Sequence, residues 1–347
     1  MNSFFQKHIQ DLSAYVPGIQ PEGTDYIKLN TNENPYPPSR QVIQALKKAS
    51  NATLRLYPNP SAEGLRKKIA DRFGLDPDCV LIGNGSDELI NLIIRSVVGP
   101  GDKVFLTYPT YILYDVLVNL QQGSKVIHSL DAQYNLTPPF ATDGLKLAFF
   151  ANPNTPTGTI FQKDILEQFC TQTEALVVID EAYVDFAKTD CLDFIHRFKN
   201  VLITRTFSKS YAMAGLRIGY VLGTPENIRE LMKIKDSYNV NRLSAIAAEA
   251  AFDDYEYMLK RAQMVIRDRK FLTKQLEKLD FDVLPSEANF VFAKHRRIDA
   301  KMIYKMLLDQ HILVRHFDLP RLNEFLRISI GTHQEMVKLI TALKLNL

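Results

Sequence analysis

The chain has 347 residues with 46% hydrophobic and 23% charged residues, which predicts a soluble globular protein of about two domains. Its formal net charge of +3 is dispersed along the chain, which argues against nucleic acid as a partner, and no segment reaches the length of a membrane span. The three cysteines, Cys79, Cys170 and Cys191, are too scattered for a disulfide framework or a metal site, so we expect a cytoplasmic protein without a bound metal.

The first part of the chain is expected to hold little regular structure. Residues 1–29 are interpreted as a short arm that packs with a small domain. Residues 30–60 are rich in proline and asparagine, which predicts ordered turns. We expect residues 30–240 to form a large cofactor-binding domain and residues 241–347 to form the small C-terminal α/β domain.

From about residue 61 to residue 240, helical and strand patterns alternate. Leu65, Ile69 and Phe73 recur with the spacing of one helix face, and residues 89–98 read as a buried helix. Continuous apolar runs predict strands that are buried on both faces, at residues 80–83, 103–107, 145–150, 175–179 and 201–204. This alternation predicts the α/β class, with a mostly parallel central sheet covered by helices.

The pattern changes near residue 240. Residues 255–279 predict one long helix, and shorter elements follow it. These are expected strands at residues 288–293 and 326–330 and expected helices at residues 300–308 and 334–343. They predict a second, smaller α/β domain.

Two segments at predicted strand ends could contact a ligand. The string Gly83–Glu88 lies between a strand and a helix, where glycines and free helical N–H groups can receive an anion, although a tight turn capped by Ser86 or Asp87 explains it equally well. The segment Thr107–Tyr111 offers aromatic rings that could stack on a flat heterocycle or simply pack in the core.

Two further segments offer an amide and a carboxylate. Prolines and a glycine in Asn152–Gly158 fix a loop that could hold the Asn152 amide as a hydrogen-bond donor. Asp180 ends a predicted strand, where it could pair with a pyridinium nitrogen, and Tyr183 follows three positions on. A metal-binding aspartate is the alternative, but it would require more convergent ligands.

The fifth segment contains Lys209, which lies among hydroxyl-bearing residues with Arg217 eight positions beyond it. A lysine amine can form a Schiff base with an aldehyde cofactor, and hydroxyls and a guanidinium can hold a phosphate. A lone lysine at a strand end is usually a solvated side chain. The interpretation therefore depends on the five segments together.

Together the five segments resemble the fold-type I pyridoxal-phosphate aminotransferases of class I/II, over nearly the whole chain. The resemblance implies pyridoxal 5'-phosphate as cofactor, with Lys209 as the Schiff-base lysine and Asp180 as the partner of the ring nitrogen. It implies that Asn152 and Tyr183 donate to the ring oxygen and that Tyr108 stacks on the ring. The implied phosphate site comprises Gly85, Ser86, Asp87, Thr206, Ser208, Arg217 and, across the interface of a homodimer, Tyr57.

Other motifs resemble the histidinol-phosphate aminotransferase branch of that family. They are Leu29–Tyr36, Arg55–Pro58, Tyr238–Asn241 and Ile312–Arg315. This resemblance implies transamination between histidinol phosphate and 2-oxoglutarate in histidine biosynthesis, with a substrate site made by Tyr15, Asn32, Arg315 and Arg327.

Two residues depart from the usual pattern: Thr155 stands where an asparagine is common, and Ser237 where a proline is common. An aromatic amino acid aminotransferase, a threonine-phosphate decarboxylase and a non-catalytic relative stay open as alternatives.

Overall fold

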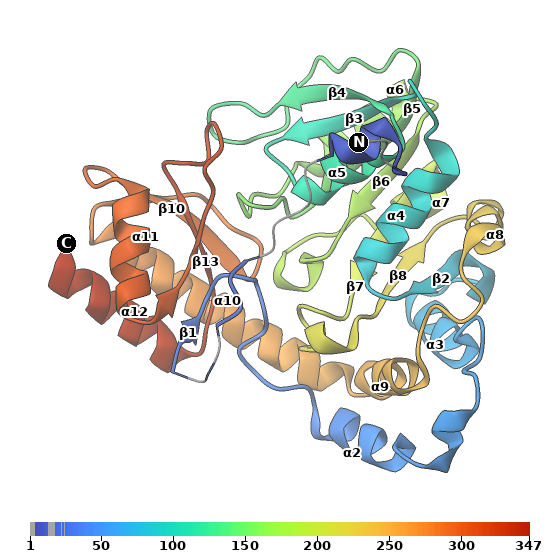
Figure 1. Ribbon diagram of the computed structural model, residues 1–347, viewed down its shortest axis with the longest axis horizontal. Coiled ribbons are helices and arrows are strands. Elements are labelled where there is room, and N and C mark those ends of the chain that lie inside the picture. The colour runs from blue at the N-terminus through green and yellow to red at the C-terminus, as the bar shows by residue number, and fades with distance from the viewer. Residues whose placement is uncertain (1–3, 13–17, 22, 24) are drawn as a thin grey trace.

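A seven-stranded sheet forms the centre of the larger part of the molecule (Figure 1). The computed structural model describes residues 4–12, 18–21, 23 and 25–347. The strand order is β2-β8-β7-β6-β5-β3-β4, and all neighbours pair in parallel except β8, which is antiparallel to both β2 and β7. The strands are β2 (Val80–Gly83), β3 (Lys103–Tyr108), β4 (Ser124–Ser129), β5 (Leu145–Ala151), β6 (Leu176–Asp180), β7 (Val201–Thr206) and β8 (Gly219–Leu222).

Helices cover both faces of this sheet, which explains why its inner strands are continuous apolar runs, whereas the edge strand β4 is polar and largely exposed. Successive strand side chains point to opposite faces. On β6, Val177 and Ile179 enter one buried cluster while Val178 enters the other. The second cluster is closed by α4 (Ser86–Val97), α5 (Ile112–Leu120) and α8 (Pro225–Ile234), and the first by α3 (Glu63–Phe73), α6 (Lys163–Gln172), α9 (Arg242–Asp253) and α10 (Tyr255–Glu277), among others. The predicted α/β class and mostly parallel sheet are confirmed.

The segment of residues 30–60, for which the sequence predicts turns, contains a ten-residue helix, α2 (Arg40–Ala49). Its N-cap is Ser39, whose hydroxyl accepts the Val42 N–H. Val42 and Ala49 are buried and lie two helical turns apart, which is the spacing of one helix face. A short 3-10 helix, Ala52–Arg55, follows.

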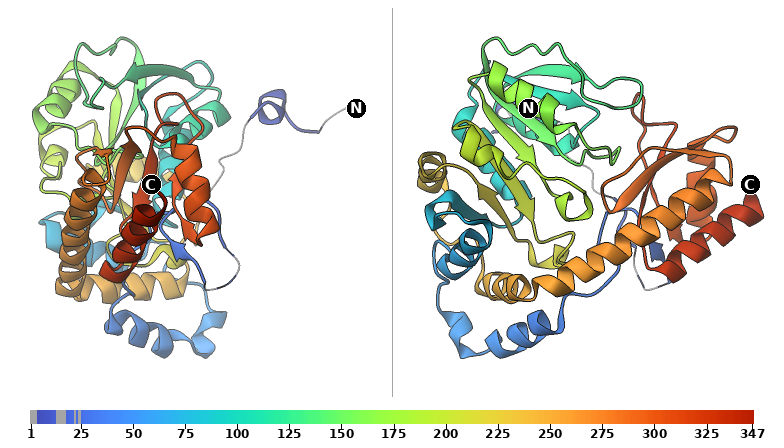
Figure 2. Two further views of the ribbon diagram at one scale, coloured as in Figure 1. Left: turned by 90° about the vertical axis from the view of Figure 1, so that its left-hand side faces the viewer. Right: turned by 180° about the vertical axis from the view of Figure 1, so that it is seen from behind.

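A four-stranded antiparallel sheet, ordered β12-β13-β10-β9, forms the smaller part. Its strands are β9 (Phe281–Val283), β10 (Phe290–His295), β12 (Arg315–His316) and β13 (Leu326–Ser329), and α11 (Ala300–Asp309) and α12 (His333–Asn346) accompany them. Helix α10 is 23 residues long and runs from the large part to this sheet (Figure 2). It thereby forms a continuous link between the two parts.

The N-terminal segment contacts both parts of the molecule. Strand β1 (Ile27–Lys28) pairs in parallel with β11 (Ile312–Leu313), next to the small sheet. Helix α1 (Lys7–Gln10) instead lies near α5 and projects from the body of the molecule (Figure 2). Within the described residues, no helix has both the length and the apolar character needed to cross a bilayer.

Candidate functional site

A cavity of about 170 Å³ lies where the carboxyl ends of β5, β6 and β7 face the small sheet and the segment that follows β1. Parallel strands end at the same edge of a sheet, so residues distant in sequence meet there. Sequence-predicted residues that line this cavity are Asn32, Ser86, Asp87, Asp180, Tyr183, Thr206, Ser208, Lys209, Arg217, Arg315 and Arg327.

Asp180, the last residue of β6, is a buried carboxyl at this cavity. It accepts hydrogen bonds from Tyr114 Oη at 2.6 Å and from Thr204 Oγ1 at 2.8 Å. Burial raises the pKa of Asp180, although these two hydroxyls oppose the shift. Both donors are neutral, so a cation delivered into the cavity would stabilise the ionised carboxylate.

A cluster of anion-binding groups surrounds the start of α4. Gly85 is its N-cap, so the free N–H groups of the first helical turn open toward the cavity at Ser86 and Asp87. Arg217 donates to Ser208 Oγ at 3.2 Å and to Asp87 Oδ2 at 3.0 Å. Gly85 has φ of +86°, and a Cβ there would lie 2.6 Å from Arg217 Nη2. This glycine therefore lets the guanidinium lie directly over the helix start.

Lys209 and Tyr183 extend this wall. The Lys209 Nζ donates to the Thr31 carbonyl at 3.5 Å and lies 5.7 Å from the centre of the Tyr183 ring. The Asn34 amide donates to the carbonyls of Lys209 and Ser210 at 3.0 Å each. The lysine backbone is thus held by the same N-terminal segment that its amine contacts.

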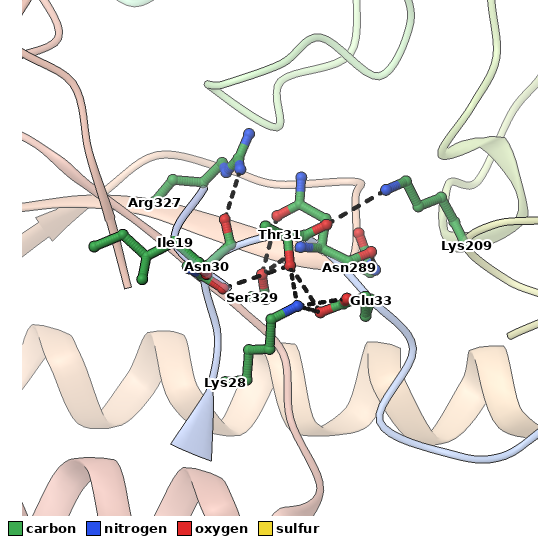
Figure 3. Close-up of polar contacts among 10 residues, drawn as sticks. Ile19, Lys28, Asn30, Thr31, Glu33, Lys209, Asn289, Arg327 and Ser329 are labelled. Carbon is green, nitrogen blue, oxygen red and sulfur yellow. Dashed lines mark hydrogen bonds and ion pairs between the residues drawn. The ribbon is translucent and has the colours of Figure 1, made fainter. Parts of the chain in front are cut away.

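That segment, residues 28–34, crosses between the two parts of the molecule and meets the small sheet at Arg327 and Ser329 (Figure 3). Lys28 forms an ion pair with Glu33 at 2.5 Å. Although burial opposes it, hydrogen bonds from Lys28 and Thr31 lower the pKa of Glu33. The ion pair joins residues 28 and 33 of this segment, on either side of the Thr31 carbonyl that the Lys209 amine contacts.

Two guanidinium groups enter the cavity from the small sheet. Arg315 and Arg327 are register partners on β12 and β13. Arg327 donates to the Asn30 carbonyl at 3.0 Å and to Thr155 Oγ1 at 3.3 Å. The ring of Phe317 lies 5.3 Å from the Arg315 guanidinium and 5.4 Å from that of Arg327. The pair offers fixed positive charge to a ligand anion.

The structure does not bring two of the predicted contact side chains to the cavity wall. The Asn152 amide oxygen accepts the Phe161 N–H at 2.8 Å, whereas its nitrogen makes only a long contact of 3.9 Å with Cys191 Sγ. The Tyr108 hydroxyl donates to the Pro320 carbonyl at 2.6 Å.

Thr155 and Tyr111, three positions beyond Asn152 and Tyr108 in the same two segments, line the cavity instead. The sequence motifs identified the two segments, but the irregular backbone after each strand decides which side chain points into the cavity. Tyr114 and Thr204 were not predicted as site residues. Thr204 is the register partner of Asp180 on β7, whereas Tyr114 reaches Asp180 from helix α5, and neither contact leaves a signal in the sequence.

The remaining predicted residues lie elsewhere. Gly85 shapes the helix start without lining the cavity. Tyr57 is 77% exposed and stacks on Tyr238 with ring centres 4.4 Å apart. Tyr15 lies outside the described residues. Across the described ranges, no group of three or more His, Cys, Asp or Glu side chains is arranged to hold a metal ion.

The cavity fits pyridoxal phosphate by its own chemistry. The helix start with Arg217 and Ser208 suits a phosphate, and the buried Asp180 suits a ring cation. Thr110 also lines the cavity, and its buried hydroxyl has no hydrogen-bond partner among the described residues, so a polar ligand atom would satisfy it.

Comparison with known proteins gives consistent results. The family model "Aminotransferase class I and II" matches residues 24–343. The chain is 44% identical over 336 residues to a histidinol-phosphate aminotransferase of Synechocystis, covering 96% of each chain. It is 41% identical to that of Syntrophotalea carbinolica, covering 97% of this chain and 98% of the relative.

Among solved structures, a histidinol-phosphate aminotransferase from Sinorhizobium meliloti in complex with pyridoxal 5'-phosphate superposes with a TM-score of 0.88. It shares 28% identity, and the alignment covers 99% of this chain and 97% of the other.

Proposed function

Because this chain belongs to the class I and II aminotransferase family, we propose that it catalyses pyridoxal-phosphate-dependent transamination between histidinol phosphate and 2-oxoglutarate in histidine biosynthesis. The observation that carries the proposal is one cavity that combines the Lys209 amine, the Asp180 carboxyl and an anion site at the start of α4. Full-length identity of 40% or more to several proteins named for this activity supports the choice of substrate.

Each cavity residue would hold one part of the cofactor, which supplies an aldehyde that exchanges with amines and a ring that accepts electrons. The Lys209 amine would hold the cofactor covalently at its aldehyde carbon, with the aldehyde oxygen leaving as water. Asp180 would keep the ring nitrogen protonated, and the Tyr183 hydroxyl would donate to the ring oxygen. The start of α4, Ser208 and Arg217 would hold the phosphate.

The substrate would be held by the opposite wall. Arg315 and Arg327 provide two planar donors that can bind a phosphate or a carboxylate in bidentate fashion. One pocket could therefore accept the phosphate of histidinol phosphate and, in turn, the carboxylates of glutamate. With the substrate anion held by these arginines, Lys209 Nζ would remove a proton from the substrate carbon and return it.

We further propose a cytoplasmic homodimer divided near residue 240 into a large and a small domain, with residues 1–29 as an arm. Tyr57 is strongly exposed and does not line the cavity of its own chain, which supports a contribution to the partner's phosphate site. The three cysteines are free, which fits a reducing compartment.

A half-reaction experiment tests the proposed function. Histidinol phosphate, phenylalanine or phosphothreonine is added to protein loaded with pyridoxal phosphate, and the visible cofactor band is followed together with release of the carbonyl product and of CO2. We expect histidinol phosphate to bleach the band fastest, and Lys209→Ala to lack both the band and multiple turnover. A faster response to phenylalanine would favour the aromatic alternative, and CO2 release from phosphothreonine would favour a decarboxylase.

A further inference from the structure

Asn32 lies between a residue of the small sheet and a residue of the cofactor wall. Its backbone N–H donates to Ser329 Oγ at 2.9 Å, and the Ser329 hydroxyl donates to Asn32 Oδ1 at 3.0 Å. Its amide nitrogen donates to Tyr183 Oη at 2.9 Å. Asn32 and Ser329 are 2% exposed and Tyr183 is 8% exposed, so water cannot readily replace these partners.

The donors in this chain of hydrogen bonds all point in one direction. A backbone N–H can only donate, so Ser329 Oγ accepts it and keeps its own hydrogen for the amide oxygen of Asn32. The amide nitrogen then faces Tyr183, whose oxygen accepts. The reverse amide orientation would leave the Ser329 hydrogen without this acceptor. As a result, the hydroxyl hydrogen of Tyr183 is directed away from Asn32.

The backbone keeps Asn32 in place. Its φ is +56°, in the left-handed region that asparagine tolerates better than most residues. The amide of Asn289 donates to the Asn32 carbonyl at 2.9 Å. Figure 3 shows Asn289 and Ser329 both reaching this segment from the small-sheet side. Asn32 is therefore held by hydrogen bonds at both backbone groups and at the oxygen of its side-chain amide.

We propose that Asn32 is a positioning residue that, anchored by Ser329, directs the Tyr183 hydroxyl proton into the cavity toward the cofactor's ring oxygen. This inference rests on the proposed function and deepens it, because it assigns to Asn32 a role that acts through Tyr183 rather than through the substrate. It also makes the electronic state of the cofactor depend on the small sheet, which supplies Ser329.

The expected consequence is spectroscopic. A donor to the ring oxygen stabilises its anionic form, and this lowers the pH at which the visible band of the loaded protein changes protonation state. Tyr183→Phe removes the donor and should raise that midpoint. Asn32→Asp keeps the side-chain size but accepts the Tyr183 proton, so it should raise the midpoint in the same direction by about half a unit or more.

A double-variant cycle separates this role from a direct effect of the new charge. In Asn32→Asp/Tyr183→Phe, the midpoint should move little beyond that of Tyr183→Phe alone. Asn32→Gly, which suits the positive φ, and Ser329→Ala should each give a smaller rise, because the Tyr183 proton is then no longer steered. Thermal unfolding and cofactor titration of every variant check that it folds and loads.

The outcomes distinguish the two proposals. If Asn32→Asp shifts the midpoint equally with and without Tyr183, or if no Asn32 or Ser329 variant shifts it while all of them load, the positioning role is overturned and the proposed function stands. If the unaltered protein develops no visible band with pyridoxal phosphate, both proposals fall together.

Discussion

At the scale of single residues, the site depends on the carboxyl of Asp180, whose burial disfavours its ionised form. Asp180 is buried, and the side chains that donate to it are the hydroxyls of Tyr114 and Thr204. Hydroxyl donors stabilise a carboxylate less than a cation does. Burial accordingly raises the pKa of Asp180, and the cofactor's ring nitrogen would supply the missing positive charge.

This raised pKa predicts a particular pH dependence of stability. Above the unfolded value of 3.8 and below the raised value, folded Asp180 keeps a proton that the unfolded chain has released. The free energy of unfolding of cofactor-free protein should therefore lose a contribution as the pH rises through this window. The side chain in Asp180→Asn cannot titrate. The free energy of unfolding of the unaltered protein minus that of this variant should therefore decrease as the pH rises.

Urea denaturation from about pH 4 to about pH 8 measures this difference. Loading with pyridoxal phosphate provides the control, because a cation beside Asp180 would lower its pKa and weaken the dependence. If the free energy of unfolding of the unaltered protein instead increased relative to that of Asp180→Asn as the pH rises, burial would not be raising the pKa of Asp180.

At the scale of elements, the anion site depends on close approach between β8 and the loop that starts α4. Gly219 is the register partner of Gly83 at the end of this strand pair. A Cβ on Gly219 would lie 2.8 Å from Ser86 N and 2.9 Å from the Arg205 carbonyl, both of them backbone atoms that cannot move alone. The close packing of β8 at Gly219 thus fixes the position of the first residues of α4.

We therefore expect Gly219→Ala to destabilise the protein by about 1–3 kcal/mol and to weaken the binding of pyridoxal phosphate. Gly215→Ala is the matched control, since a Cβ there meets nothing within 4 Å, and its effect on stability should stay within about 0.5 kcal/mol. Urea denaturation and a cofactor titration followed by visible absorbance measure both effects. Equal cofactor affinity in the two variants would show that the strand does not position the helix start.

Secondary structure was predictable where burial imposes a pattern. Strands β5 and β7 lie between two helical layers, so their apolar runs could be recognised without knowledge of the fold. Helix α2 was missed because its neighbours are rich in proline and asparagine, although Val42 and Ala49 lie on one face. In such a short helix, the local turn signals outweigh two buried positions.

At the scale of the whole molecule, the exposed side chains indicate a surface that one chain leaves uncovered. Leu54 and Leu56 are each 48% exposed, Tyr57 is 77% exposed, and Tyr57 stacks on Tyr238, which is 47% exposed. Apolar and aromatic side chains grouped in this way are typical of interfaces. This surface is where we expect the second subunit of the proposed homodimer.

Sedimentation equilibrium should therefore give a mass of twice 39.6 kDa. Leu56→Asp should weaken association and, if Tyr57 completes the partner's phosphate site, should also lower cofactor affinity. Leu345→Asp is the control, because Leu345 is 78% exposed near the C-terminus and should affect neither property. A monomeric protein that binds the cofactor tightly would contradict the proposed cross-subunit role.

The sequence alone determined the α/β class, the central strands and the five segments that reach the site, because apolar runs and residue chemistry are local properties of the chain. The tertiary structure decided which side chain of each segment enters the cavity. It placed Tyr111 and Thr155 there in place of Tyr108 and Asn152, and it aligned Tyr114 with Asp180. These contacts depend on irregular backbone and on partners distant in sequence, and neither leaves a periodic signal along the chain.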